Sequence, residues 1–302
     1  MTTSTPPIAN ALDASPLDLA EAYEYCRSIT RQSGSSFASA FWLLPAERRR
    51  AIHAIYAFCR LSDDIADNPA LAGDRSLLLA RWRDELEAVY ADRSTHPVGI
   101  ALADTVRRFD LPKNIFDDLL LGIESDLRSE SIDTFDDLRT YCYRVASTVG
   151  LLVVIVLGCR SPQALEYAET LGIAVQLTNV LRDVSFDASS GRVYLPAEDL
   201  ERLNIKRTDL ASPIPGPELR TVLASYAERA RILYERAESL LPDEYRKDLR
   251  PAEAMGRIYA KLLEELHRQR FMNQASPGSP IRLSPQRRIA IAAGTWLGIR
   301  RP

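Results

Sequence analysis

Asp63-Asp64-Ile65-Ala66-Asp67 is an acidic stretch that follows a mostly apolar run, Ala54-Ile55-Tyr56-Ala57-Phe58-Cys59-Arg60. Asp63 and Asp67 are four residues apart, which on a helix places both carboxylates on one face, one turn apart. Tyr56 and Arg60 lie at helical spacing on the turns before them. Polar side chains on an otherwise apolar helix must be satisfied or used. The stretch therefore predicts a helix whose acidic face does chemistry rather than simply meeting solvent.

A second acidic pair with the same spacing, Asp183 and Asp187, lies more than a hundred residues later, and Gln176 and Asn179 precede it at helical intervals. The four side chains form a polar stripe on an apolar helix. Mg²⁺ takes hard oxygen ligands and is normally held by one or two carboxylates together with substrate phosphates. Two facing helices of this kind would suit a diphosphate bridged by several Mg²⁺ ions. Four carboxylates alone would repel one another, and the ions and Arg60 would relieve that repulsion.

The composition bounds the class of protein. The chain has 302 residues, 46% hydrophobic and 26% charged, and its net charge of −3 gives no reason to expect nucleic acid as a partner. The three histidines have no ligand spacing, which argues against zinc. The longest apolar run, residues 145–158, is too short to span a membrane. The four cysteines form no C-x-x-C pair and no secretory signal is recognised, so we expect reduced core thiols in the cytoplasm.

The rest of the chain is predicted to be helical, because no stretch shows the alternation typical of a strand. We expect a flexible arm over residues 1–16, a helical domain over 17–273, and a Pro/Ser/Gly-rich linker with a basic amphipathic tail over 274–302. The expected helices cover residues 46–67, 74–91, 96–109, 113–128, 138–157, 162–187, 218–241 and 251–273. The predicted fold class is all-α.

Three segments leave two interpretations open. The hydroxyl-rich turn at residues 33–37 either caps the next helix or contacts a phosphate, and a helix N-terminus can do both. Ala146, Ser147 and Gly150 form a groove that serves either close helix packing or the wall of a channel for an apolar ligand. The tail at residues 287–299 has apolar residues and a tryptophan between arginine pairs. It either lies on a membrane surface or docks on the body of the protein.

Together these features resemble the squalene/phytoene synthase family, the head-to-head prenyl transferases. The resemblance is carried by residues 36–67, 141–150 and 176–196, and it extends over about residues 23–271. One D-D-x-x-D motif alone would be weak, but two acidic motifs in their own contexts are specific. The resemblance implies a single all-α isoprenoid synthase domain, a helical bundle with a central cavity. It also implies that the acidic motifs at the mouth of this cavity hold Mg²⁺ and two diphosphates.

The resemblance also implies roles for the residues that match the family's motifs. The metal ligands would be Asp63, Asp67, Asp183, Asp187 and Asn179. The substrate-binding residues would be Ser36, Phe37, Arg60, Val145, Ala146, Gly150, Gln176, Asn179, Arg182 and Arg192. The catalytic residues around the reacting carbons would be Tyr56, Tyr141, Tyr194 and Arg60. Asp64 belongs to the first motif without a clear ligand role, and Phe186 stands where the family commonly has an acidic residue.

The activity that the resemblance implies is a head-to-head condensation of two prenyl diphosphates. Bulky side chains along the expected path of the isoprenoid tail, Phe41, His53 and Tyr56, would shorten the accepted chain. Residues 145–150 also look more like the bacterial presqualene/squalene branch. We therefore expect two farnesyl diphosphates to give presqualene diphosphate or a squalene-type C30 product. The alternative is phytoene from two geranylgeranyl diphosphates.

Cofactors, partners and rival functions follow from the same residues. Mg²⁺, or Mn²⁺ in its place, is the expected cofactor, and the absence of a G-x-G-x-x-G fingerprint leaves the use of NADPH open. The expected partners are prenyl diphosphates, with peripheral contact of the tail to the inner membrane surface; the oligomeric state is open. An inactive relative acting as a scaffold protein is the non-enzyme alternative. An EF-hand needs alternating oxygen ligands and a central glycine, which residues 63–67 lack, and residues 176–196 speak against a plain terpene cyclase.

Overall fold

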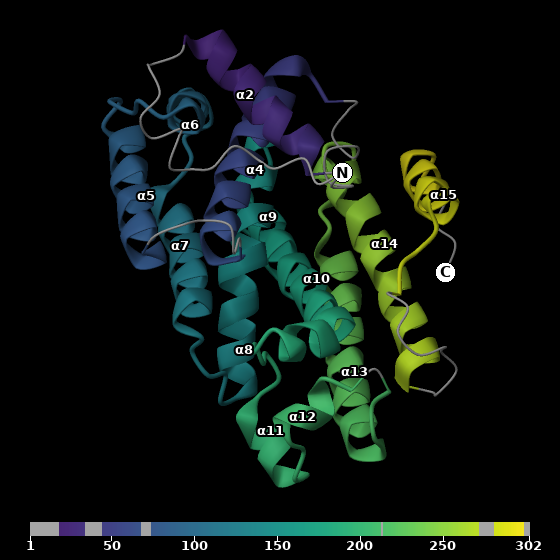
Figure 1. Ribbon diagram of the computed structural model, residues 1–302. Coiled ribbons are helices and arrows are strands. Elements are labelled where there is room, and N and C mark those ends of the chain that lie inside the picture. The colour runs from purple at the N-terminus through teal and green to yellow at the C-terminus, as the bar shows by residue number, and fades with distance from the viewer. Residues whose placement is uncertain (1–17, 34–43, 68–73, 213, 272–280, 299–302) are drawn as a thin grey trace. The chain divides into compact units, whose positions relative to one another are not determined.

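The computed structural model describes residues 18–33, 44–67, 74–212, 214–271 and 281–298. Every regular element in these ranges is a helix (Figure 1). The all-α fold class predicted from the sequence is therefore confirmed. The expected flexible arm, the turn that contains Ser36 and Phe37, and the bulky Phe41 lie outside the described residues.

The helices form two compact units. The first consists of Met1–Arg128 and Leu151–Cys159, and the second of Ser129–Gly150 and Arg160–Pro302. Each unit is described by itself. The expectation of a single domain over residues 17–273 stays a prediction.

The first unit is built around one long helix. α4 (Ala46–Asp67) packs against α2 (Leu19–Gln32), α5 (Arg75–Tyr90), α6 (Pro97–Phe109) and α7 (Lys113–Arg128). The apolar face of α4 explains this position. The Phe58 ring stacks on the Trp82 ring with 5.1 Å between ring centres, and it meets the Phe116 ring edge-on with 5.4 Å between centres. The Trp82 indole N–H donates to the Ser62 hydroxyl at 2.9 Å. The helix that carries the first acidic pair is thus anchored on several sides.

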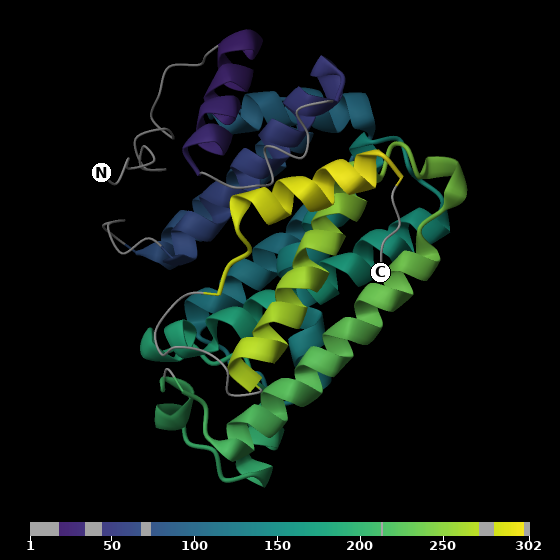
Figure 2. The same ribbon diagram turned by 90° about the vertical axis from the view of Figure 1, so that its right-hand side faces the viewer.

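The second unit is organised around α10 (Pro162–Ser189), which packs most extensively against α13 (Pro217–Leu240). The Tyr234 hydroxyl of α13 lies 2.8 Å from Thr178 Oγ1 and donates to the Ala174 carbonyl at 3.1 Å. The remaining elements are η2 (Asp243–Tyr245), α14 (Arg250–Leu266), η3 (His267–Phe271) and α15 (Pro285–Trp296), together with α11 (Ala197–Arg202) and α12 (Arg207–Leu210). α15 lies across α14 (Figure 2).

A continuous helix precedes α10 and contains a π-helical turn. It consists of α8 (Phe135–Cys142), η1 (Tyr143–Ser147) and α9 (Thr148–Val156). Among the described residues, this is the one helix that is long and apolar enough to cross a membrane. Half of its most apolar stretch is buried inside the protein. Its η1 turn packs along α10. The core helix of a folded domain can have these properties as well as a membrane-spanning one, so the expectation that no segment spans a membrane stays a prediction.

Close packing accounts for two of the three small residues in this helix. The Ser147 hydroxyl donates to the Glu169 carbonyl at 2.7 Å. A Cβ atom built on Gly172 would lie 2.5 Å from Ser147 Cα, and one built on Gly150 would lie 3.2 Å from the Ala168 carbonyl oxygen. The two helices can therefore approach this closely only because the residues are small. For Gly150, which the resemblance placed in the substrate channel, the structure supports the packing interpretation.

Candidate functional site

The acidic face of α4 ends in two carboxylates that solvent reaches. Asp63 and Asp67 are exposed, whereas Asp64, Ile65 and Ala66 are buried, as helical periodicity requires. Although solvent reaches Asp63, protein atoms crowd its carboxyl group. This desolvation and the charge of Asp67 raise the pKa of Asp63 to about 7. A cation at this pair would lower that pKa again, so the local electrostatics favour cation binding.

Asp64 and Arg60 form an ion pair within α4, with 2.7 Å between Arg60 Nη2 and Asp64 Oδ1. The Asp64 side chain is 8% exposed and the Arg60 side chain 42%. Asp64 therefore points away from the exposed pair and holds Arg60 in place. Tyr56 lies half-buried earlier on the same helix.

The predicted polar stripe of α10 is present. Gln176, Asn179, Asp183 and Asp187 are all half-buried. The residues Leu177, Val180, Leu181 and Val184, which lie between them in the sequence, are buried. The Asn179 amide donates to Gln176 Oε1 at 3.2 Å. Asn179 Oδ1 is buried without a hydrogen-bond partner. A buried, unpartnered carbonyl-type oxygen beside two carboxylates is the type of donor that Mg²⁺ prefers, so the residues present fit a divalent cation.

Arg182 neutralises Asp183. Its Nε and Nη2 atoms donate to the two carboxylate oxygens at 2.8 and 2.5 Å, in a two-point ion pair. This interaction raises the pKa of Arg182, and a hydrogen bond with the Tyr259 hydroxyl contributes. The planar guanidinium matches a diphosphate as well as it matches a carboxylate. If a cation bound Asp183 in place of the guanidinium, Arg182 would be free to bind the diphosphate of a substrate.

The loop after α10 folds back on the acidic end of that helix. Arg192 N–H donates to the Asp187 carbonyl at 2.8 Å, and Gly191 makes the turn with φ of +85°. Further along the loop, the Tyr194 ring stacks on the Tyr141 ring, with 4.8 Å between ring centres and 23° between the ring planes. The structure thus brings together Asp187, the Arg192 backbone and two predicted tyrosines. Their rings present a flat aromatic surface next to the acidic helix.

Two further groups complete the site of the second unit. Val145 and Ala146 lie half-buried in the π-helical turn η1, a type of turn that occurs frequently at functional sites. Tyr259 of α14, through its contact with Arg182, is a site residue that the sequence analysis missed. Its only signal is a tyrosine within the apolar pattern of a helix, which is more typical of core packing.

Phe186 does not occupy the acidic face. Its side chain is 74% exposed, so it points into solvent while Asp183 and Asp187 remain half-buried on the stripe. The departure from the family's usual acidic residue therefore leaves the D-x-x-x-D pair intact.

The two acidic pairs belong to different units, Asp63 and Asp67 to the first and Asp183 and Asp187 to the second. Among the described residues, no group of three or more His, Cys, Asp or Glu side chains lies within reach of one metal ion. The joint action of the two pairs on one metal cluster stays a prediction.

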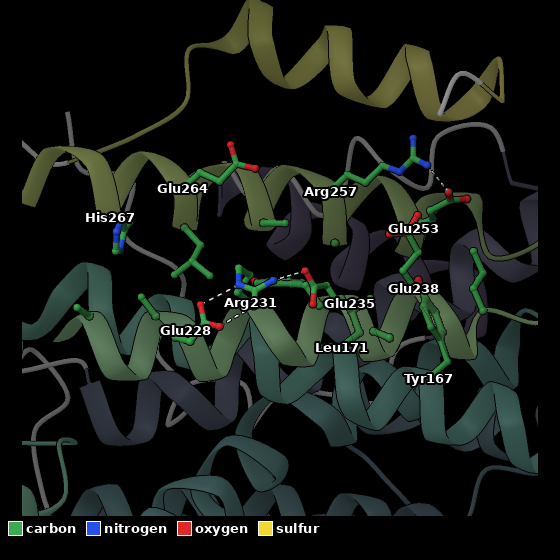
Figure 3. Close-up of a pocket in the computed structure, with 18 residues that line it drawn as sticks. Tyr167, Leu171, Glu228, Arg231, Glu235, Glu238, Glu253, Arg257, Glu264 and His267 are labelled. Carbon is green, nitrogen blue, oxygen red and sulfur yellow. Dashed lines mark hydrogen bonds and ion pairs between the residues drawn. The ribbon is translucent and has the colours of Figure 1, made fainter. Parts of the chain in front are cut away.

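The second unit also contains a groove of about 600 Å³ between α13 and α14, floored by α10 (Figure 3). Its floor is apolar and includes Leu171, Ala227 and Leu263, while Glu228, Arg231 and other charged side chains form its rim. None of the predicted site residues lines it. We therefore regard the groove as separate from the candidate active site.

Comparison with known proteins decides the family. The family model described as squalene/phytoene synthase matches residues 30–288. The chain belongs to the squalene/phytoene synthase family. Members of this family are prenyl transferases that join two prenyl diphosphates head to head, which confirms the type of enzyme expected from the two acidic motifs.

The relatives found by sequence are phytoene synthases. The chain is 37% identical to the phytoene synthase of Arthrospira platensis over 270 residues, which cover 85% of this chain and 87% of the relative. It is 40% identical to the 15-cis-phytoene synthase of Synechocystis sp. over 230 residues, which cover 72% and 68%. Among solved structures, a dehydrosqualene synthase in complex with ligand aligns with a TM-score of 0.80 and 29% identity over 93% of this chain and 97% of the other. A squalene synthase from Alicyclobacillus acidocaldarius aligns with a TM-score of 0.76 and 30% identity, over 87% of this chain and 99% of the other.

These relatives favour the phytoene alternative over the farnesyl substrate that we expected, and they give no support for NADPH. The expectation depended partly on His53 as an obstacle to a long chain. In the structure the charged neighbours of His53 are Arg49, Arg27 and Glu24, the last two on α2. His53 thus lies toward α2.

Proposed function

We propose that the protein joins two geranylgeranyl diphosphates head to head to form phytoene, in a Mg²⁺-dependent reaction. The observation that carries the proposal is the similarity to phytoene synthases over most of the chain, at 37% identity to that of Arthrospira platensis. The half-buried acidic stripe of α10 and the exposed acidic pair of α4 supply the residues that the reaction requires.

The proposed metal ligands are Asp63, Asp67, Asp183, Asp187 and Asn179. When bound there, Mg²⁺ would neutralise the charge that develops on the departing diphosphate. Arg60, Arg182 and Arg192 would bind the diphosphate oxygens and hold both substrates in register. Arg182 already makes a two-point ion pair with Asp183, so its guanidinium is oriented toward the same region. Tyr259 would keep Arg182 oriented once Asp183 has released it.

The carbon chemistry needs a dry and aromatic environment. The first substrate loses diphosphate to give an allylic cation, the C2=C3 double bond of the second attacks C1 of that cation, and loss of a proton closes a cyclopropane ring. The stacked rings of Tyr141 and Tyr194 would face the cation and exclude water. A desolvated cation–π contact of this type contributes about 2 kcal/mol. A second loss of diphosphate, rearrangement and proton loss then give phytoene without a reductant.

Incubation of the purified protein with Mg²⁺ and each prenyl diphosphate separately tests this proposal. The expected product from geranylgeranyl diphosphate is phytoene, identified by mass and absorption spectrum, and its formation should stop with EDTA and return with added Mg²⁺. A C30 product from farnesyl diphosphate, with geranylgeranyl diphosphate unreacted, would reverse the choice of substrate. No condensation of either substrate would refute the assignment as a whole.

A further inference from the structure

The face that α15 turns toward α14 is fixed by an apolar contact. Ile281 and Leu283, just before α15, are buried together with Leu262 and Leu266 of α14, and Ile291 of α15 packs against this cluster. The rotation of α15 about its axis is therefore determined, and so is the face that it turns outward.

The outward face is apolar. Ile289 is 68% exposed and Leu297 is 75% exposed, and Ala293, also exposed, lies midway between them. The three residues are spaced by four, so they form one continuous stripe, which we call the outer stripe of α15. Trp296 is half-buried at its edge, with the Arg250 guanidinium 5.7 Å from the centre of its ring.

The charge around the outer stripe differs in sign from that of the whole chain. Residues 281–298, the described segment that carries the stripe, contain three arginines and no acidic residue, although the chain carries a net charge of −3. Arg282 is exposed, and Arg287 has a half-exposed side chain and only a 4.0 Å contact with Glu265. An exposed apolar stripe bordered by arginines combines two properties: it can enter an apolar boundary, and it attracts anions.

We propose that the outer stripe of α15 is a peripheral membrane-binding surface for an anionic lipid bilayer. Ile289 and Leu297 would enter the boundary between headgroups and acyl chains, Trp296 would lie at the headgroup level, and the arginines would contact anionic headgroups. The benefit of such binding rests on the proposed function, because the substrates are amphiphiles and the C40 product is a hydrocarbon that dissolves in lipid rather than in water.

A second copy of the chain is the other conceivable occupant, because the groove between α13 and α14 has an acidic rim over an apolar floor (Figure 3). Most of its acidic groups are already engaged, however. Arg231 forms ion pairs with Glu228 and Glu235, and Arg257 contacts Glu253 at 3.0 Å. These contacts leave less negative charge for the arginines near α15, so the charge pattern favours a lipid surface.

Co-sedimentation of the full chain with vesicles tests the proposal. The wild type should bind vesicles of phosphatidylcholine with about a third phosphatidylglycerol, bind pure phosphatidylcholine weakly, and lose binding as salt is raised. The double variant I289E/L297E should bind the anionic vesicles at least about tenfold more weakly, because two apolar anchors are replaced by negative charges. Leu77→Glu on α5 is the matched control, since Leu77 is 60% exposed on the other unit, and it should bind like the wild type.

The outcomes separate the alternatives. Unchanged vesicle binding by the double variant, or no binding of the wild type to anionic vesicles, would overturn the proposal. So would a wild-type dimer that becomes a monomer in the variant by light scattering, which would assign the stripe to a second copy. The thermal midpoint of the variant should match that of the wild type because both side chains are exposed. Activity on substrate in detergent micelles should also be unchanged, so loss of vesicle binding and failure of the proposed function are measured independently.

Discussion

Asn179 illustrates how one atom reports on the state of the site. Its Oδ1 is buried without a hydrogen-bond partner, an arrangement that destabilises a protein by about 1–3 kcal/mol unless a ligand satisfies it. Asn179→Leu removes that oxygen at similar volume. We expect its thermal midpoint without metal to equal or exceed that of the wild type, and the rise on adding Mg²⁺ and pyrophosphate to fall to about half or less.

Differential scanning fluorimetry measures both quantities. Gln163→Leu is the control, because Gln163 is exposed at the start of the same helix and should keep the full rise. An equal ligand-induced rise in Asn179→Leu and the control would remove Asn179 from the metal ligands.

The acidic pairs themselves are tested by charge removal at one member of each. Asp63→Asn and Asp183→Asn should each lower kcat by about 100-fold or more, because each removes stabilisation of the charge on the departing diphosphate. Glu169→Gln on α10 should retain activity, since Glu169 makes only an exposed 3.9 Å contact with Arg139. Steady-state assays with geranylgeranyl diphosphate measure the effect, and near wild-type rates in either aspartate variant would refute its role.

At the scale of elements, the N-terminus of α6 makes the stability of the first unit depend on pH. His96 caps this helix, since its Nδ1 accepts from the Val98 N–H at 3.1 Å, and burial lowers its pKa to about 4. An unfolded histidine titrates near 6.5. Between these values the unfolded chain binds a proton that the folded chain does not, so stability is complete above about pH 6.5 and falls as the pH drops toward 4.

His96→Asn keeps a capping acceptor and does not titrate. The histidine should make the wild type lose about 2 kcal/mol more unfolding free energy than this variant between pH 7 and pH 5. Urea unfolding at the two pH values measures the difference. Burial also raises the pKa of the nearby Glu85, which accepts a hydrogen bond from the His96 backbone N–H. Both proteins contain Glu85, so its contribution to the pH dependence cancels in the comparison. Parallel pH profiles of the two proteins would show that His96 does not cause the effect.

Close packing of η1 on α10 is tested by adding one methyl group. Gly172→Ala places a Cβ atom 2.5 Å from Ser147 Cα, so the helices must separate, and we expect a destabilisation of about 1–3 kcal/mol. Gly294→Ala in α15 meets no atom within 4 Å and should stabilise by up to about 1 kcal/mol through helix propensity. Denaturant unfolding compares the two. A tolerated methyl group at Gly172 would contradict the packing described here.

The helices could be predicted from sequence more completely than their interruptions. The helix predicted over residues 162–187 ends within two residues of the observed end of α10 (Pro162–Ser189). The short helix α12 was not predicted, because four residues are too few to show a helical period. The π-helical turn η1 was not predicted either, and local propensity gives no signal for such a turn. Its tight contact with α10 at Gly172 depends on residues distant in sequence.

For the whole molecule, sequence reasoning identified the acidic pairs but not every group around them. Spacing along a helix was enough to find Asp63, Asp67 and the stripe of α10. Tyr259 escaped because its role depends on contact with Arg182, which only the fold supplies. The relatives favour the C20 substrate over the C15 substrate that we expected. One argument for C15 relied on the direction in which His53 points, which cannot be determined from its position in the chain.

The proposed reaction requires the acidic pairs of α4 and α10 to bind a single metal cluster around the substrate diphosphate. The most direct test is the anomalous diffraction of Mn²⁺ in crystals grown with an unreactive thio analogue of geranylgeranyl diphosphate. The account predicts Mn²⁺ ions bound by the analogue's diphosphate and by carboxylates of both pairs, Asp63 and Asp67 together with Asp183 and Asp187. Ions bound at one pair alone, or a diphosphate bound away from both, would contradict it.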